Sequence, residues 1–348
     1  MHYLVVGTGA IGTYLGVNLA HVGHRVTFLA RPATAARLRQ SGIQLTCAHG
    51  EVRRIPAPEI AASPAEALEN NTYDGVLLAI KTYHTPAFLE SVQPWRESFP
   101  PVVCMQNGVE AESVLASFFG ENKVLAGTVT TAVARPTVGK AIVERARGIG
   151  LAEGHPLTPL LAEAWRQAGV EVRTYANGAA MKWSKLLTNL LGNATSAILD
   201  MPPGDVFAHP ASAHLEITQL REALAVMRAL RLPVVDLPGA AVRQLAWALR
   251  WLPFVVLQPG LQRVAGSGRG GKMPSLHIDL HSGRGQTEVD ALNGAVVRYG
   301  EKTGVPTPVN RGLARILEAL TAGTLPLDTF RGKPEALYKA ILPPKTIA

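Results

Sequence analysis

Short apolar runs alternate with segments of helical periodicity through the first half of the chain. The apolar runs predict buried strands, and they cover residues 2–6, 25–29, 75–80, 101–105, 124–134, 149–153 and 170–175. Strands that alternate with helical segments are typical of an α/β fold with a mostly parallel sheet. We therefore predict such a sheet in the first half, and the turn signal Asn177-Gly178 marks its end.

The second half of the chain has a different pattern. Residues 179–235 and 286–322 have helical periodicity and few strand signals, which predicts a mostly helical region. Between these segments, residues 238–272 form a basic, tryptophan-bearing insertion. The proline-rich residues 323–348 are predicted to be a peripheral tail.

A glycine-rich turn follows the first predicted strand. The run Gly7-Thr8-Gly9-Ala10-Ile11-Gly12 has the spacing G-x-G-x-x-G and leads into a helical pattern. Gly7 permits a tight turn, Gly9 lets the backbone approach a pyrophosphate, and Gly12 lets the helix pack closely on the sheet. Backbone N–H groups at the helix start can then bind the phosphates. An isolated motif of this kind is weak evidence, but here the strand, turn, helix and second strand all follow in order.

This motif defines the predicted domains. We expect an N-terminal Rossmann dinucleotide-binding domain at residues 1–177, followed by a mostly helical C-terminal domain at residues 178–322. The second domain would bind substrate and would form the interface of any homodimer.

The end of the second predicted strand indicates which dinucleotide binds. NAD sites place an Asp or Glu there, whereas this chain has Ala30 and Arg31 and no acidic residue before Glu51. A guanidinium pairs with the 2′-phosphate of NADPH, which a carboxylate would repel. Arg31 therefore favours NADPH, with Arg37 and Arg39 as further candidates. The alternative is that Arg31 is an ordinary solvated arginine.

Polar residues follow two further predicted strands. Lys81 follows the strand at residues 75–80, and Gln106-Asn107-Gly108 follows the strand at residues 101–105. Open α/β sheets bind ligands at the carboxyl ends of their strands, so Lys81 and Asn107 could contact cofactor or substrate. Asn-Gly is also common in turns, and on spacing alone the turn is the favoured interpretation of Asn107-Gly108.

Residues 181–198 carry the most informative helical pattern. Lys185, Asn189 and Asn193 repeat every fourth residue and share one face. The opposite face is apolar and comprises Trp183, Leu186, Leu187, Leu190, Leu191, Ala194 and Ile198. Solvated helix faces usually carry stronger helix formers than asparagine, and no carboxylate lies between residues 172 and 199. The polar face fits a pocket for an anionic substrate, while the pattern alone leaves a solvated face as the alternative.

Two more segments need an interpretation. A second polar cluster comprises Ser275, Asp279, Thr287, Glu288, Asp290 and Asn293. Residues 287–290 also resemble a helix start with a cap and an acidic first turn, which would explain Glu288 and Asp290 without a function.

Residues 266–272 have the spacing of a phosphate loop, but Met273 replaces the Ser or Thr that would reach magnesium. A mobile basic loop is the preferred interpretation of this segment.

Composition narrows the partners. The chain has 348 residues, 47% of them apolar, which suits two domains with their own cores. The net charge of +8 favours anionic ligands, but no dense basic run with interleaved aromatics points to nucleic acid. The two cysteines and the absence of a signal peptide indicate a reducing cytoplasm. The longest apolar run, residues 251–257, is too short to span a bilayer. We expect neither a membrane nor a metal ion at the site.

Together these motifs resemble the ketopantoate reductase (2-dehydropantoate 2-reductase) family. The resemblance covers residues 1–235 and 273–322. Its most specific part is Lys185-Leu186-Leu187-Thr188-Asn189-Leu190-Leu191-Gly192-Asn193, which is similar to the family's K-x-x-x-N-x-x-x-N helix. The other matches are Gly7-Thr8-Gly9-Ala10-Ile11-Gly12, Gly23-His24, Arg31, Lys81, Gln106-Asn107-Gly108, Pro274-Ser275, Asp279, Thr287 to Gly294, Gly304 to Pro308 and Asn310.

The resemblance implies an activity and roles for these residues. It implies the NADPH-dependent reduction of 2-dehydropantoate to pantoate in pantothenate and coenzyme A biosynthesis. Lys185 would be the general acid, and Glu288 would bind the substrate's hydroxyl group. Asn107, Asn189, Asn193 and Ser275 would orient cofactor and substrate. This chemistry agrees with the residues, because a cationic lysine can stabilise the negative charge on a reduced carbonyl oxygen and then protonate it.

Two departures from the family pattern limit this interpretation. The interval between Ser275 and Glu288 is slightly longer than in the family, and the family pattern does not account for residues 238–272. These departures leave the identity of the 2-keto acid open. Alternatives are a reductase of a different 2-keto acid and a non-catalytic NADP-sensing protein. Lys185 and Glu288 argue against the sensor, which needs no proton donor.

Overall fold

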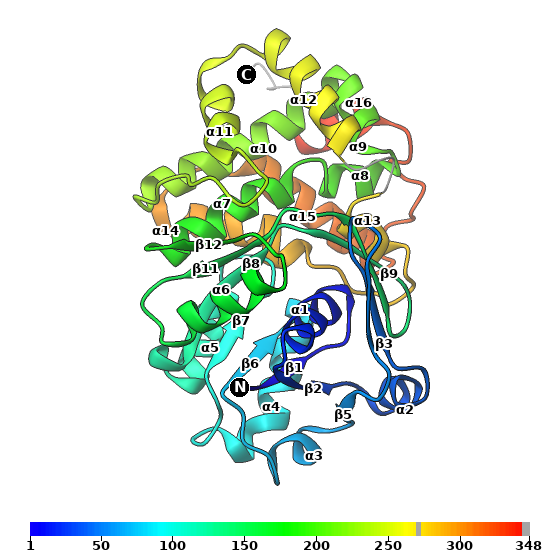
Figure 1. Ribbon diagram of the computed structural model, residues 1–348. Helices are drawn as coiled ribbons and strands as arrows, with labels where there is room; N and C mark the ends of the chain where they lie inside the picture. Colours follow the sequence, from blue (N-terminus) through cyan, green and yellow to red (C-terminus); the bar gives the residue numbers. More distant parts are fainter. Residues whose placement is uncertain (269–272, 343–348) are drawn as a thin grey trace. The chain divides into compact units, whose positions relative to one another are not determined.

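The computed structural model describes residues 1–268 and 273–342, which form two compact units (Figure 1). The first unit comprises Met1–Lys182 together with Asp236–Ala240. The second unit comprises Trp183–Val235 and the described residues from Ala241 onward. The boundary lies inside helix α7 (Gly178–Leu190), a few residues after the boundary expected from the sequence.

The first unit is built on an eight-stranded sheet in the order β12-β11-β8-β7-β6-β1-β2-β5. Its strands are β1 (His2–Val6), β2 (Arg25–Leu29), β5 (Glu59–Ala61), β6 (Gly75–Leu78), β7 (Val102–Cys104), β8 (Val124–Val129), β11 (Ile149–Ala152) and β12 (Val172–Tyr175). Only the β8–β11 pair is antiparallel. The chain winds outward from β1 in both directions, as in a Rossmann fold, so ligands are expected beyond the carboxyl ends of β1 and β6.

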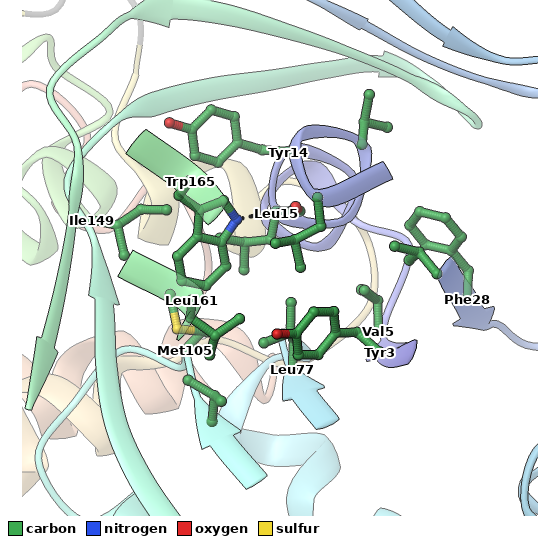
Figure 2. Close-up of a cluster of buried hydrophobic side chains, with 14 of the residues drawn as sticks. Tyr3, Val5, Tyr14, Leu15, Phe28, Leu77, Met105, Ile149, Leu161 and Trp165 are labelled. Carbon is green, nitrogen blue, oxygen red and sulfur yellow. Dashed lines mark hydrogen bonds between the residues drawn. The ribbon is translucent and has the colours of Figure 1, made fainter. Parts of the chain in front are cut away.

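The helices of the first unit connect and cover these strands. They are α1 (Ala10–His21), α2 (Pro32–Ser41), α3 (Pro64–Leu68), α4 (Thr85–Val92), α5 (Ala111–Phe119) and α6 (Leu157–Gln167), with short 3-10 turns at Thr82–His84, Gln93–Trp95 and Glu121–Lys123. A buried cluster on one face of the sheet joins β1, α1 and α6, and Figure 2 shows Val5, Leu15 and Trp165 within it. The Trp165 indole donates a hydrogen bond to the Leu15 carbonyl oxygen (3.4 Å). This packing fixes α1 on the sheet.

A second sheet, which the sequence did not predict, covers the other side of α1. Its four strands have the order β4-β3-β10-β9 and are β3 (Ile43–Thr46), β4 (Val52–Ile55), β9 (Ala132–Thr137) and β10 (Lys140–Arg145). Helix α1 contacts all four strands. Every residue of α1 from Gly12 to Leu19 is buried, as expected for a helix packed on both sides.

The expected single strand at residues 124–134 is wrong, because the chain leaves the main sheet after β8. At the break, Thr130 Oγ1 donates to the Gly148 carbonyl oxygen (3.0 Å), and Thr131 Oγ1 accepts from the Gly148 N–H (2.9 Å). These bonds end β8 and direct the following residues into β9 of the second sheet.

The second unit is helical. It contains the rest of α7 and α8 (Ala194–Leu199), α9 (Pro203–Ala208), α10 (Pro210–Ala229), α11 (Val242–Trp251), α12 (Phe254–Gly268), α13 (Ser275–Leu280), a π-helical turn at Asp290–Gly294, α14 (Ala295–Thr303), α15 (Pro308–Thr321) and α16 (Pro334–Ile341). Helix α10 is central, since it contacts α9, α11, α14, α15 and α16. Among the described residues, no helix is long and apolar enough to cross a bilayer.

The insertion at residues 238–272 and the expected tail at residues 323–348 both contain helices. The insertion at residues 238–272 contains α11 and α12, and its residues 269–272, part of the loop with phosphate-loop spacing, lie outside the described residues. The expected tail at residues 323–348 contains α16, whose Leu337 is fully buried and which contacts α10 and α15. Helix α16 therefore packs on the core of the helical unit, whereas most residues from 323 to 333 are exposed.

Candidate active site

The glycine turn has the geometry that a dinucleotide requires. Gly7 has φ of +100°, and its N–H donates to the Leu29 carbonyl oxygen (3.1 Å) at the end of β2. A Cβ on Gly12 would lie 1.8 Å from the Gly7 carbonyl oxygen, whereas a Cβ on Gly9 would have no neighbour within 4 Å. Gly12 is thus required by packing within the protein. Gly9 instead borders open space at the N-terminus of α1, where a phosphate can approach the backbone N–H groups.

The loop after β6 touches this turn. A Cβ on Gly7 would lie 2.8 Å from Ile80 Cγ2 and 3.1 Å from the Ala79 carbonyl oxygen. Lys81 follows directly and is half-buried at the start of the 3-10 turn Thr82–His84. The structure therefore places Lys81 next to the loop that borders the glycine turn.

Gln106 ties the end of β7 to the end of β6. Its side-chain amide donates to the Ile80 carbonyl oxygen (3.0 Å) and to Thr85 Oγ1 (2.9 Å). Asn107 follows and is half-buried, and Gly108 has φ of +84°, so the turn interpretation of Asn107-Gly108 holds for the backbone. These hydrogen bonds hold the backbone of the Asn107 turn at the carboxyl edge of the sheet.

The three arginines near β2 are in different situations. Arg31 is exposed at the N-cap of α2, and its guanidinium forms no hydrogen bond or ion pair with any described residue. Arg39, a further candidate for the 2′-phosphate, donates to the Ile60 carbonyl oxygen (2.8 Å) and forms an ion pair with Glu66. Because the Arg39 guanidinium already has these partners, Arg31 and Arg37 are the better candidates for binding a phosphate.

Sequence analysis missed a buried ion pair beneath the Asn107 turn. Lys182, in α7, has 4% of its side chain exposed, and its Nζ lies 2.7 Å from Glu112 Oε1. The same Nζ donates to the carbonyl oxygens of Gln106 (2.5 Å) and Gly127 (3.3 Å). Lys182 thus connects β8 and α5 to Gln106, the residue before Asn107. No local signal could have revealed this pair, because its partners are far apart in the sequence.

The predicted helix at residues 181–198 is two helices. The apolar periodicity continues through the segment, but α7 ends at Leu190, Gly192 has φ of +60°, and α8 begins at Ala194. Lys185 and Asn189 share one half-buried face of α7 as predicted. Asn193 is not part of that helix, because it is the N-cap residue of α8.

This break brings together residues that are distant in the sequence. The Asn193 amide nitrogen donates to the Asn189 carbonyl oxygen (2.9 Å) and to Ser275 Oγ (3.3 Å). Asn193 Oδ1 accepts from the Leu276 N–H (3.0 Å) at the start of α13. Asn189, Asn193 and Ser275, which we call the amide–serine cluster, are therefore adjacent, and the exposed Ser275 lies at its edge.

A buried glutamate that the sequence did not single out supports the break. Glu216, fully buried in α10, accepts a hydrogen bond from the Gly192 N–H (2.7 Å) and another from Thr195 Oγ1. Glu216 therefore fixes the residues on both sides of Asn193.

Glu288 is buried, with 3% of its surface exposed, and lies just before the π-helical turn Asp290–Gly294. The expected helix start with an acidic first turn is present, because the helix begins at Val289 and Asp290 lies in its first turn, but no side chain caps it. Single π turns often occur at functional sites. The π-helical turn after Glu288 is compatible with a functional role for this residue, while Asp290 forms an ion pair with Arg298.

The two units offer complementary chemistry. The first has free space over Gly9, no acidic residue in the first turn of α1, and the exposed Arg31, which together fit a phosphorylated dinucleotide. The second has Lys185 and Asn189 on one helix face, the amide–serine cluster and the buried Glu288, groups that suit a small oxygen-rich anion.

Comparison with known proteins identifies the family. The family model for "Ketopantoate reductase PanE/ApbA" matches residues 3–153, and the model for "Ketopantoate reductase PanE/ApbA C terminal" matches residues 177–321. This chain belongs to the ketopantoate reductase family. The resemblance stated from the sequence is confirmed, and the protein is an oxidoreductase.

Relatives of this family member span nearly its full length. A 2-dehydropantoate 2-reductase of Halobacterium salinarum is 26% identical over 326 residues, which cover 91% of this chain and 98% of the relative. One of Pyrobaculum aerophilum is 28% identical over 315 residues, covering 90% and 96%. The matched length thus includes both units of this chain.

Solved structures agree. The PanE/ApbA family ketopantoate reductase of Ralstonia eutropha JMP134 superimposes with a TM-score of 0.78 at 25% identity, covering 93% of this chain and 99% of the other. D-mandelate dehydrogenase, solved with NADH and anilino(oxo)acetate, has the same fold, with a TM-score of 0.77 at 20% identity. The superposition covers 93% of this chain and 99% of the dehydrogenase. The expected combination of a Rossmann domain and a helical domain is therefore confirmed.

Proposed function

We propose that this ketopantoate reductase family member reduces 2-dehydropantoate to pantoate with NADPH. The amide–serine cluster carries the proposal, because it places Asn189, Asn193 and Ser275 together beside the helix face that holds Lys185. The curated relatives named 2-dehydropantoate 2-reductase support the choice of substrate. In this proposal, residues 1–177 bind the cofactor and residues 178–322 bind the keto acid.

The first unit supplies the groups that would hold NADPH. The backbone of residues 7–12 would bind the diphosphate, since the space over Gly9 is open and Thr8, Ala10 and Ile11 lie in the same turn. Arg31 would pair with the 2′-phosphate. Lys81 and Asn107, at the carboxyl ends of β6 and β7, would bind the ribose and nicotinamide region. When bound, this cofactor supplies the hydride.

The second unit supplies the proton and orients the acid. As the carbonyl carbon accepts hydride, its oxygen gains negative charge, which the Lys185 ammonium stabilises and then neutralises by donating a proton. Asn189 and Ser275 would hold the oxygens of the substrate, and Asn193 fixes both of them. Glu288 would accept a hydrogen bond from the substrate's hydroxyl group.

The decisive experiment follows NADPH oxidation in the presence of 2-dehydropantoate and of other 2-keto acids. We expect Lys185→Met to lower kcat by about a hundredfold or more, the range for loss of a general acid, with the Kd for NADPH unchanged. Lys339→Met, which removes an exposed lysine of α16, is the matched control and should retain full activity. Full activity of Lys185→Met would refute the assigned role. NADPH binding without oxidation of any 2-keto acid would indicate a sensor instead.

A second experiment tests the choice of cofactor. Arg31→Glu should weaken NADPH binding at least tenfold and leave NADH binding little changed, because only NADPH carries the 2′-phosphate. Arg37→Glu has the same change in charge and should have the smaller effect. Equal losses for both cofactors in Arg31→Glu would show that Arg31 does not contact the 2′-phosphate.

A further inference from the structure

Two histidines and an aspartate gather on the helical unit, outside the residues assigned to the reaction. Asp200 follows α8, and His277 and His281 lie in and just after α13. His277 Nε2 is 2.6 Å from Asp200 Oδ1, and His281 Nε2 is 3.9 Å from the same oxygen. All three ligand atoms lie within 4.8 Å of one another. Among the described residues, no other three His, Cys, Asp or Glu side chains are grouped in this way.

Backbone geometry holds these three side chains in place. The His281 N–H donates to the His277 carbonyl oxygen (3.0 Å), so the two histidines are one helical turn apart and their ring centroids are 4.2 Å from each other. Asp200 has a left-handed conformation, with φ of +52°, which Asp and Asn adopt more readily than other residues with a side chain. Helices α8 and α13 pack against each other, so the carboxylate faces the imidazoles.

Arg331 sets the orientation of the carboxylate. Its Nε and one terminal nitrogen both donate to Asp200 Oδ2, at 2.8 and 2.5 Å. Oδ2 is therefore occupied, and Oδ1 is the oxygen that faces His277 and His281. Ligating carboxylates in metal sites are commonly held by an outer hydrogen bond of this kind.

We propose that Asp200, His277 and His281 form a binding site for one divalent transition-metal ion such as Zn²⁺. Two imidazole nitrogens and one carboxylate oxygen suit Zn²⁺ or Co²⁺ better than Mg²⁺ or Ca²⁺, which prefer oxygen ligands. Zn²⁺ takes such ligands at about 2.0–2.2 Å. The ion would replace the hydrogen bond between His277 Nε2 and Asp200 Oδ1, and the partly exposed His281 ring would turn its Nε2 toward the ion. Water or a further ligand would complete the coordination.

The test uses the untagged full-length protein, because an affinity tag of histidines would bind the same ions. The protein is treated with a chelator, and Co²⁺ is added while the visible absorption is recorded. Zn²⁺ binding is measured separately by calorimetry. We expect one ion per chain, a Co²⁺ spectrum typical of nitrogen and oxygen ligands, and a Zn²⁺-dependent rise in Tm.

Variants show whether these residues are the ligands. Asp200→Asn and His281→Gln should each weaken Zn²⁺ binding at least tenfold, and Asn keeps the left-handed backbone conformation. His209→Gln, which changes an exposed histidine elsewhere in the helical unit, should leave binding unchanged. Each variant is first checked for wild-type circular dichroism. The absence of Co²⁺ binding by the wild type, or equal binding by all variants, would overturn the proposal. Neither measurement involves turnover, so the result is independent of the proposed function.

Discussion

Replacing Gly9 with alanine separates cofactor binding from folding. The added Cβ would meet nothing within 4 Å, and the backbone of Gly9, with φ of −76° and ψ of −170°, is open to alanine. The same methyl group would project into the space that a diphosphate must enter to reach the N-terminus of α1. The Gly12→Ala variant is the comparison, because it adds the same methyl group at a position with no room for it. Its Cβ would lie 1.8 Å from the Gly7 carbonyl oxygen.

The expected magnitudes differ for stability and for binding. Alanine is a poorer N-cap than glycine by about 1 kcal/mol, and it gains about 0.4–1 kcal/mol by restricting the unfolded chain. These effects nearly cancel, so the free energy of unfolding of Gly9→Ala should change by less than about 1 kcal/mol. The methyl group prevents at least one backbone N–H from bonding a phosphate oxygen, a charged hydrogen bond of about 1.5–3 kcal/mol. The Kd for NADPH should therefore rise about tenfold to a hundredfold.

Fluorescence titration with NADPH and chemical denaturation measure the two quantities on the same samples. Gly12→Ala should lose about 1–3 kcal/mol or more of stability, because the backbone must shift to admit the methyl group. A wild-type Kd for Gly9→Ala would refute the inference that phosphate passes over Gly9. A loss of stability as large as that of Gly12→Ala would show that the space over Gly9 is not open in solution.

Three further predictions concern buried or paired charges. Lys182→Met should lower the free energy of unfolding by about 3 kcal/mol, because it leaves the Glu112 carboxylate without its partner, and the double variant with Glu112→Gln should recover part of this loss in chemical denaturation. Glu216→Gln weakens the two hydrogen bonds that fix the break between α7 and α8. It should therefore raise KM for the keto acid and leave the Kd for NADPH unchanged. Steady-state kinetics and NADPH titration measure the two constants. Hydrogen bonds from Arg53 and His49 lower the pKa of Glu51 from 4.5 to about 2. Its stabilising effect is therefore present above pH 4.5 and is lost as the pH falls toward 2, and Glu51→Gln should reduce the loss of stability over that interval in acid denaturation.

Local sequence signals predicted the parts of the fold that depend on local structure. The strands at the centre of the main sheet are continuous apolar runs, and the glycine turn lies where a strand and a helix meet, so both were predicted. The second sheet was missed because its strands are short and carry polar residues, as in β4, which contains Arg53 and Arg54. Its pairing of β3 with β10 also joins segments far apart in the chain, and such pairing leaves no periodic signal.

The candidate site shows the same limit. Lys185, Asn189 and Asn193 were found because residues four apart share a helix face. The break at Gly192 was not predicted, because the apolar periodicity continues from α7 into α8. That periodicity does not indicate that Gly192 has a positive φ. Lys182 and Glu216 were missed for a different reason. Their partners lie in other elements, so only the folded chain shows what they hold in place.

The break changes the chemistry that Asn193 can perform. An asparagine amide has two N–H groups and one oxygen with two lone pairs. The N–H groups of Asn193 bind the Asn189 carbonyl oxygen and Ser275 Oγ, and its oxygen accepts from the Leu276 N–H. One lone pair of Oδ1 remains for a ligand, so Asn193 can accept a hydrogen bond from a substrate hydroxyl but has no N–H left for a carboxylate or a keto oxygen. In the proposed function, binding of those oxygens would therefore depend on Lys185, Asn189 and Ser275, and Asn193 would hold the last two of these together.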